Sequence, residues 1–244
     1  IFKADIPSGK IMSYTLFDIF QNQASLNKAP TTDLLLFNIE SSNKGASTVF
    51  PVISLKQEDK KKIPRINGSA IIKDDKLAGF LNGEETKDLL FIKNQVSGGI
   101  LVEEMQTENE PVSVSLEIFK NKTKVTPEVK NKEITFNVNI DTLVAVGEVN
   151  GKGNFFDEKG IKKLEEGAGK TLKKRAEALI KKLQQDYGAD IFGFSSSLRE
   201  NKVQAYKSVS NNWSETFKDL KVNVKAKISI KNSGILSKNI IEGE

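Results

Sequence analysis

The sequence predicts an α+β protein of two domains, each an antiparallel or mixed β-sheet with packed helices. The chain has 244 residues, which is enough for two ordinary domains. In its second half, residues 112–118 and 134–140 alternate apolar and polar side chains, a period of two that is typical of antiparallel strands with one buried face. A long helix and a final alternating segment follow, which is the order expected when helices pack on one face of a sheet and the last strand returns to it.

The first predicted domain covers residues 1–105. Residues 11–23 should form a short amphipathic helix, because apolar side chains recur there at helical spacing, and residues 82–94 should form a second helix. Asn82 can cap this second helix, and the acidic residues of its first turn suit the positive end of the helix dipole. Strands are expected at residues 32–39, 48–55, 66–73, 76–81 and 100–105.

The segments that link these strands have the composition of turns. Residues 40–47 are polar, and the charge run at 56–62 (KQEDKKK) is typical of a solvated loop or a hairpin end. Asp74-Asp75 and Glu84-Glu85 are paired carboxylates, a composition that acid–base catalysis can use. Because the first pair lies where a turn is needed and the second where a helix begins, the sequence favours turn and cap roles for them.

The second predicted domain covers residues 106–244. Its strands are expected at residues 112–118, 122–129 and 134–140, with 143–149 extending the last of these after a bend. Residues 157–187 keep apolar side chains at a spacing of three and four, which predicts one long helix that stops at Gly188. Further helical stretches at 195–207 and 211–217 and a strand at 222–230 complete this domain.

Composition restricts the kinds of function. The chain has no Cys and no His, which removes thiol nucleophiles, disulfides, histidine-based triads and the usual zinc ligands, so we expect neither an enzyme nor a bound metal or cofactor. A carboxylate-based hydrolase stays open as an alternative. The chain begins at Ile1 without Met, and we expect it to be a piece of a longer protein.

Basic residues are in slight excess. Lys+Arg 37 against Asp+Glu 32 gives a net charge of +5, which suits an anionic membrane surface or an acidic partner but is also common in proteins that bind neither. No apolar run approaches the roughly 20 residues needed to span a membrane. Acids are mixed among the lysines of the long helix and aromatic residues are almost absent there, so we expect no nucleic-acid binding.

Two motifs have both a functional and a structural interpretation. Gly169-Lys170-Thr171 resembles the end of a phosphate-binding loop, but it lies inside the predicted long helix, and Leu164 stands where the motif needs glycine. Gly167 and Gly169 more simply predict a bend or a close packing contact.

Trp213 and Phe217 lie four residues apart, which favours core packing, with an exposed anchor for a partner as the alternative. The candidate partner contacts are therefore Lys173, Lys174, Arg175, Trp213 and Phe217.

Two segments carry a resemblance to a known family. Residues 66–90, INGSAIIKDDKLAGFLNGEETKDLL, resemble the stretch G-x-A-v-F-K-x-D-K-L-v-G-x-L-x-x-x-E-T-x-G-L-L of the Ger(x)C family. Residues 189–194, ADIFGF, followed by Trp213, Phe217 and the strand at 222–231 ending at Ser233-Gly234, resemble that family's ending. The matching positions are Gly68, Lys76, Leu77, Gly79, Glu85, Thr86, Asp190, Phe192, Gly193, Phe194 and Gly234. Ile72, Asp88 and Ser195 depart from the pattern.

The resemblance implies a function that composition alone does not. Ger(x)C proteins are the C subunits of nutrient germinant receptors of bacterial spores, lipoproteins of three α+β domains held at the outer face of the spore inner membrane beside two integral-membrane subunits. This chain would lack the first domain with its lipidated Cys, and would act through protein–protein contacts. The alternative is a solute-binding module that senses a nutrient itself, with a pocket near residues 96–105.

Overall fold

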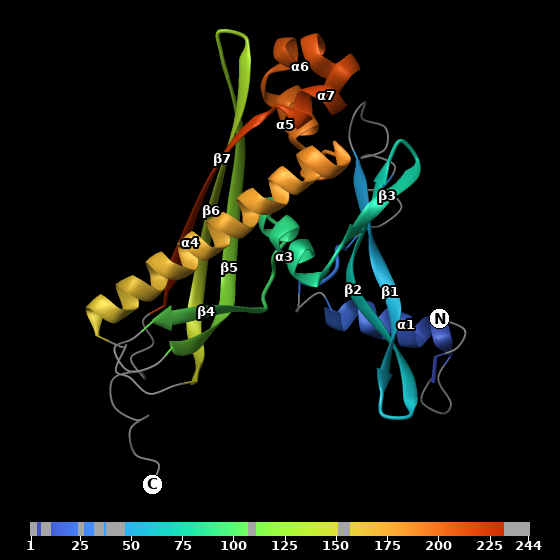
Figure 1. Cartoon of the computed structure of the whole chain (residues 1–244), viewed down its shortest axis with the longest axis vertical. Coiled ribbons are helices and arrows are strands. Elements are labelled where there is room, and N and C mark those ends of the chain that lie inside the picture. Colours follow the sequence, from blue (N-terminus) through green and yellow to red (C-terminus); the bar gives the residue numbers. More distant parts are fainter. Residues whose placement is uncertain are drawn as a thin grey trace.

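The computed structural model describes residues 4–5, 11–23, 27–31, 37, 47–106, 111–150 and 157–231. Within these residues the chain forms one sheet of three strands and one of four, and the helix α3 (Gly83–Ile92) lies between them (Figure 1). A long helix crosses the larger sheet, and the last strand of the chain returns to that sheet. The fold is therefore the α+β fold that the sequence predicts.

The smaller sheet is a three-stranded antiparallel meander. Its strands are β1 (Thr48–Glu58), β2 (Lys61–Lys73) and β3 (Lys76–Leu81), in that order. The charge run at 56–62 is the end of the first hairpin, as predicted. Asp74 and Asp75 link β2 to β3 with φ values of 49° and 58°, which is the backbone of a two-residue hairpin turn and confirms their turn role. Helix α1 (Met12–Gln23) lies against β2.

The larger sheet is mixed. Its strands are β4 (Ile100–Gln106), β5 (Pro111–Lys130), β6 (Glu133–Asn150) and β7 (Lys221–Ile230), in that order. The first three strands run antiparallel. Strand β7 pairs with β6 in parallel, because the helices return the chain to the end of the sheet where β6 begins, and β7 starts there. Strand β6 continues without a break through the predicted extension at 143–149.

The helices after β6 cover one face of the larger sheet. They are α4 (Glu158–Lys182), a π-helical turn (Leu183–Tyr187), α5 (Phe194–Asn201), α6 (Val203–Val209), a 3₁₀ turn (Ser210–Asn212) and α7 (Trp213–Lys218). Asp157 caps α4 by accepting from the Gly160 N–H at 2.7 Å, and Gly188 ends the helical run in the left-handed conformation, as predicted. Gly169 lies against β7, where a Cβ would stand 3.0 Å from the Ala226 carbonyl, so its predicted packing role is confirmed.

Two local predictions are wrong. The segments 112–118 and 122–129 are one strand, β5, because a bulge at Phe119 shifts the register between Ile118 and Lys120 and interrupts the alternation. The helix predicted at 195–207 is interrupted at Lys202, whose backbone (φ −142°, ψ 63°) is not helical. The strand predicted at 32–39, apart from residue 37, most of the turn at 40–47, and Gly234 lie outside the described residues.

The division into two domains at residues 105 and 106 stays a prediction. The strand assigned to the end of the first domain, β4, pairs along its length with β5 and so belongs to the larger sheet. If the chain divides into two units, the sheets put the division before β4. The buried apolar side chains nevertheless form one cluster, which runs from Ile71 and Leu81 through α3 to the helices over the larger sheet.

Candidate functional site

A charged contact joins α3 to α4. The guanidinium of Arg175 on α4 donates from Nε to Oδ2 of Asp88 at 3.1 Å, and its Nη2 lies 2.9 Å from Oδ1 of Asp88 and 3.1 Å from Oε2 of Glu84. About two turns further along α4, and at the N-terminal end of α3, Nζ of Lys182 lies 2.6 Å from Oε1 of Glu85. We call these five residues the helix junction. It fixes the register of two helices that are far apart in the sequence.

Burial shifts the pKa of charged side chains at and beside the helix junction. Asp88 is 5% exposed, and its Oδ1 makes no hydrogen bond of good geometry although Arg175 is near. Burial raises the pKa of Asp88 to about 6, against the opposing pull of Arg175. Burial also lowers the pKa of Lys87, whose Nζ donates to the Ile100 carbonyl of β4 at 2.9 Å. The junction therefore lies where α3 is connected both to α4 and to the larger sheet.

A second contact joins the β2–β3 hairpin to the end of the long helix. Nζ of Lys73 donates to the Tyr187 carbonyl at 3.1 Å and to Oγ of Ser214 at 2.8 Å. Gly79 lies against the ring of Tyr187, and a Cβ at this position would collide with that ring. The family-motif glycine at this place is thus explained by a close approach between the two parts of the chain, because no other residue leaves room for the tyrosine.

A third contact organises the segment around Asp190. The carboxylate is 1% exposed and accepts the backbone N–H groups of Gly193, Phe194 and Ser195 at 3.1, 3.1 and 2.7 Å. It also accepts the indole N–H of Trp213 at 3.0 Å. Burial raises the pKa of Asp190, whereas these four donors favour its charged form. Asp190 therefore caps α5 and attaches α7 to it.

Most of the other family-motif positions have structural roles. Gly68 has φ +97°, and a Cβ there would collide with the Leu81 carbonyl, so only glycine fits. Glu85 completes a capping box by accepting from the Asn82 N–H at 2.9 Å, which confirms the predicted cap. Thr86 is buried and bonds to Oγ of Ser69 at 2.8 Å. Phe192 and Phe194 stack on each other in the core, whereas Lys76 and Leu77 are exposed.

The candidate partner contacts divide into two groups. Trp213 and Phe217 are 1% and 0% exposed, so they are core residues, and their interpretation as an exposed anchor is wrong. Arg175 is occupied within the chain by Asp88 and Glu84, which makes it a poor partner contact. Lys173 and Lys174 are exposed on α4, and Lys173 lies 3.7 Å from Glu177. These two lysines remain available to a partner.

Sequence reasoning missed the contacts that hold the two sheets together. Arg175 is the one arginine among the lysines of α4, and Asp88 is a departure from the family pattern. Both residues stand out in the sequence, but no local pattern indicated that these two residues, 87 positions apart, form a pair. Lys73 and Tyr187 are 114 positions apart and carried no signal of contact.

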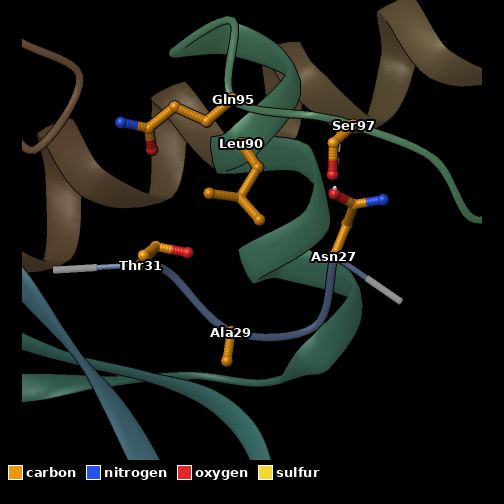
Figure 2. A pocket seen from close by; sticks show the side chains of 6 residues that line it. All are labelled: Asn27, Ala29, Thr31, Leu90, Gln95 and Ser97. Carbon is orange, nitrogen blue, oxygen red and sulfur yellow. Dashed lines mark hydrogen bonds between the residues drawn. The ribbon is translucent and has the colours of Figure 1, made fainter. Parts of the chain in front are cut away.

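A small cavity lies beside the C-terminal end of α3. It has a volume of about 240 Å³ and is lined by Asn27, Ala29, Thr31, Leu90, Gln95 and Ser97 (Figure 2). The Asn27 amide is already used there, because its Nδ2 donates to the Gly98 carbonyl and its Oδ1 accepts the Ser97 N–H at 3.3 Å. The volume is below the roughly 300–1,000 Å³ of typical ligand pockets. Of the lining residues, Ser97 lies inside the region where the sequence predicted a pocket, residues 96–105, and Gln95 adjoins it.

Comparison with known proteins gives consistent results. The family model described as "Spore germination B3/ GerAC like, C-terminal" matches residues 67–234. Spore germination protein YndF of Bacillus subtilis (strain 168) is 26% identical over 93% of this chain and 55% of its own length. Spore germination protein B3 of the same organism is 27% identical over 71% of this chain and 46% of its own length. The chain spans about half the length of these relatives.

A solved structure supports the fold. The crystal structure of the GerBC protein superposes with a TM-score of 0.65 at 24% sequence identity, covering 77% of this chain and 57% of the other. Spore germination protein GerQC of Bacillus cereus is 24% identical over 93% of this chain and 60% of its own length. The matched residues 67–234 include the helix junction, the Lys73–Tyr187 contact and the Asp190 cap.

Proposed function

Because the chain belongs to the spore germination B3/GerAC-like C-terminal family, we propose that it is a non-enzymatic part of a nutrient germinant receptor that acts through protein–protein contacts. The observation that carries this proposal is the family match over residues 67–234, which extends from β2 past the end of β7. The three relatives named above are each called a spore germination protein.

The chemistry of the chain supports contacts rather than catalysis. There is no Cys or His to serve as nucleophile or neutral-pH base. The two most deeply buried aspartates of the described residues are engaged in the structure itself, Asp190 with four N–H donors and Asp88 with Arg175. A carboxylate that orders the fold is poorly placed to exchange protons with a substrate.

We infer the location and partners from the family resemblance. The parent protein would be held at the outer face of the spore inner membrane by a lipid anchor on the part that precedes this chain. Its partners would be the two integral-membrane subunits of the receptor. Among the described residues, no helix is long and apolar enough to cross a membrane.

Co-purification tests the contact role. The parent protein carrying this chain is expressed with the two integral-membrane subunits, and assembly is compared for the wild type and for K173E/K174E on the exposed side of α4. Loss of assembly in K173E/K174E supports a contact at this place. The matched control K162E/K163E makes the same charge change near the other end of the same helix, at residues that are also exposed. Failure of the wild-type parent protein to co-purify with either subunit would overturn the proposal.

The cavity supports a second candidate, a module that senses a nutrient directly. Figure 2 shows Thr31 on one side of the cavity, the Asn27–Ser97 pair on the other, and Leu90 of α3 between them. The volume of about 240 Å³ has room for a small polar solute. Isothermal calorimetry with a panel of amino acids and sugars is the test. Heat that saturates in the wild type and disappears in L90W, which fills the cavity, would support sensing. Silence across the panel would remove this candidate.

A further inference from the structure

The larger sheet has one face that the described helices leave open. Helix α4 lies against β7 at Gly169, and α5 stacks Phe194 on Phe136 of β6 with ring centroids 4.6 Å apart. Both contacts use the same, buried face of the sheet, and Figure 1 shows α4 crossing that face. The side chains that alternate with the buried ones on β5, β6 and β7 therefore point away from every described helix.

Lysines gather on this open face from two strands. Their positions follow from the register: Lys122 pairs with Asp141, which pairs with Lys227, and in the next row Lys124 and Lys225 flank Asn139. In the row on the other side, Lys120 of β5 lies opposite Leu143. We call the five exposed residues Lys120, Lys122, Lys124, Lys225 and Lys227 the lysine face. Its lysines form one column on β5 and one on β7, and these two columns stand about 10 Å apart with β6 between them.

Within the described part of the chain, these lysines outnumber the acidic side chains that stand beside them. None of them takes part in an ion pair there, whereas other lysines do: Lys182 pairs with Glu85, and Lys218 pairs with Glu215 at 2.8 Å. Asp141 of β6 stands between the two columns, and on β5 itself Glu117 and Glu128 stand beyond the two ends of the lysine row. Like charges held this close on a rigid sheet repel one another, so the arrangement costs stability unless an anion lies against it.

An apolar border adjoins the lysine face. The bulge in β5 turns Phe119 and Lys120 outward together, and Phe119 stays 53% exposed. Leu143, in the same row on β6, is 36% exposed. Nζ of Lys231 lies 5.3 Å from the centre of the Phe119 ring. Large apolar side chains therefore stand directly beside lysines that form no ion pair within the described residues.

We propose that the lysine face docks on an anionic phospholipid bilayer. A sheet face presents its cations on one broad surface, as a layer of headgroups requires, and each lysine close to an anionic surface adds to binding. Phe119 and Leu143 can enter the headgroup region, as aromatic and aliphatic side chains do at membrane interfaces. Nucleic acid fits less well, because the face offers neither arginine forks nor a row of aromatic platforms for bases. The docking extends the proposed function by naming the surface that would lie against lipid.

Vesicle co-sedimentation tests the docking. The full 244-residue chain is mixed with vesicles of phosphatidylcholine, with and without phosphatidylglycerol. We expect binding only when phosphatidylglycerol is present, and we expect it to weaken as salt is raised. The variant K122E/K124E/K225E reverses three of the five charges and should weaken binding at least about tenfold. F119S should weaken it by a smaller factor.

The matched control is K162E/K163E/K170E, which makes the same total charge change at exposed residues of α4. It should bind anionic vesicles as the wild type does. Because all substituted side chains are exposed, circular dichroism and thermal unfolding should show each variant folded, and K122Q/K124Q/K225Q replaces any charge-reversal variant that is not. An equal loss in the control would overturn the docking site. So would binding to polyglutamate with no binding to vesicles, which would identify an acidic protein segment as the partner. Neither result changes the outcome expected in the co-purification test, so the docking and the proposed function can fail independently.

Discussion

Two buried aspartates are held in opposite ways. Asp190 is surrounded by four neutral N–H donors, three of them from the backbone within five residues of it. Asp88 instead faces the charged guanidinium of Arg175, and one of its oxygens makes no hydrogen bond. Both are nearly inaccessible, at 1% and 5% exposure. The first satisfies its charge locally, and the second depends on a residue 87 positions away.

The difference shows what each aspartate can do for the molecule. Backbone donors are fixed once α5 forms, so Asp190 sets a local geometry that does not depend on another ionised side chain. An ion pair between helices holds only while both partners are charged and in place. The Asp190 cap is therefore the rigid element, and the helix junction is the one that solution conditions can change.

The largest expected effect is at Asp190. The variant D190A leaves three backbone N–H groups and the Trp213 indole N–H buried without their acceptor, so we expect a loss of about 3 kcal/mol or more in the free energy of unfolding. Chemical denaturation followed by the fluorescence of Trp213, the one tryptophan of the chain, measures it. D190N keeps the shape and one acceptor oxygen and should lose less. A loss below about 1 kcal/mol in D190A would show that the four hydrogen bonds to Asp190 contribute little to the free energy of unfolding.

The next largest effect is at Arg175. The variant R175M leaves the Asp88 carboxylate buried without its cation, and we expect a loss of about 2–3 kcal/mol at neutral pH. Adding D88N removes the stranded charge, so the double variant should recover part of that loss, and a double-mutant cycle measures the coupling. No such rescue exists for Asp190, which has no charged partner among the described residues. Additive losses in the cycle would contradict the pairing.

Stability should depend on pH through Asp88. Its pKa is about 6 in the folded protein, against an ordinary value of 3.8 for an aspartate in an unfolded chain, so the folded protein binds this proton more tightly. Protonation of Asp88 therefore stabilises the fold as the pH falls from about 6 towards 4, and that stabilisation is lost as the pH rises through the same window. We expect the stability of the wild type relative to D88N to fall by about 1–2 kcal/mol between about pH 4 and pH 7. A flat difference would mean that Asp88 stays charged.

Sequence patterns predicted the elements well where a period repeats within one segment. The alternation at 134–140 and the three-and-four spacing at 157–187 became β6 and α4, and the capping position of Asn82 was visible from residue types alone. The strand β5 was divided wrongly, because a single extra residue, Phe119, breaks the alternation without ending the strand.

Contacts between distant segments could not be predicted in this way. Trp213 offered two interpretations from spacing, and the structure shows it in the core, with its indole N–H donating to the Asp190 carboxylate at 3.0 Å. The lysine face has the same origin, because the parallel pairing of β7 with β6 brings Lys225 and Lys227 opposite the lysines of β5. Local periodicity says which face a side chain takes, but not which strand becomes its neighbour.

The smallest expected effect is at the exposed end of the helix junction. Lys182 and Glu85 are 31% and 26% exposed, and the hydrogen bond from Lys182 to Glu85 raises the pKa of the lysine. Water screens this pair, so K182A should cost less than about 1 kcal/mol, and less still at high salt. E85A should cost more, because Glu85 also accepts the Asn82 N–H of the capping box.

Thermal unfolding of K182A beside K181A, an exposed lysine on the same helix, measures the contribution of the pair alone. If K182A lost as much as R175M, the exposed end of the junction would stabilise the two helices as strongly as its buried centre. The expected difference between a buried and a solvated ion pair would then be wrong for this helix–helix contact, in which α3 and α4 form both pairs.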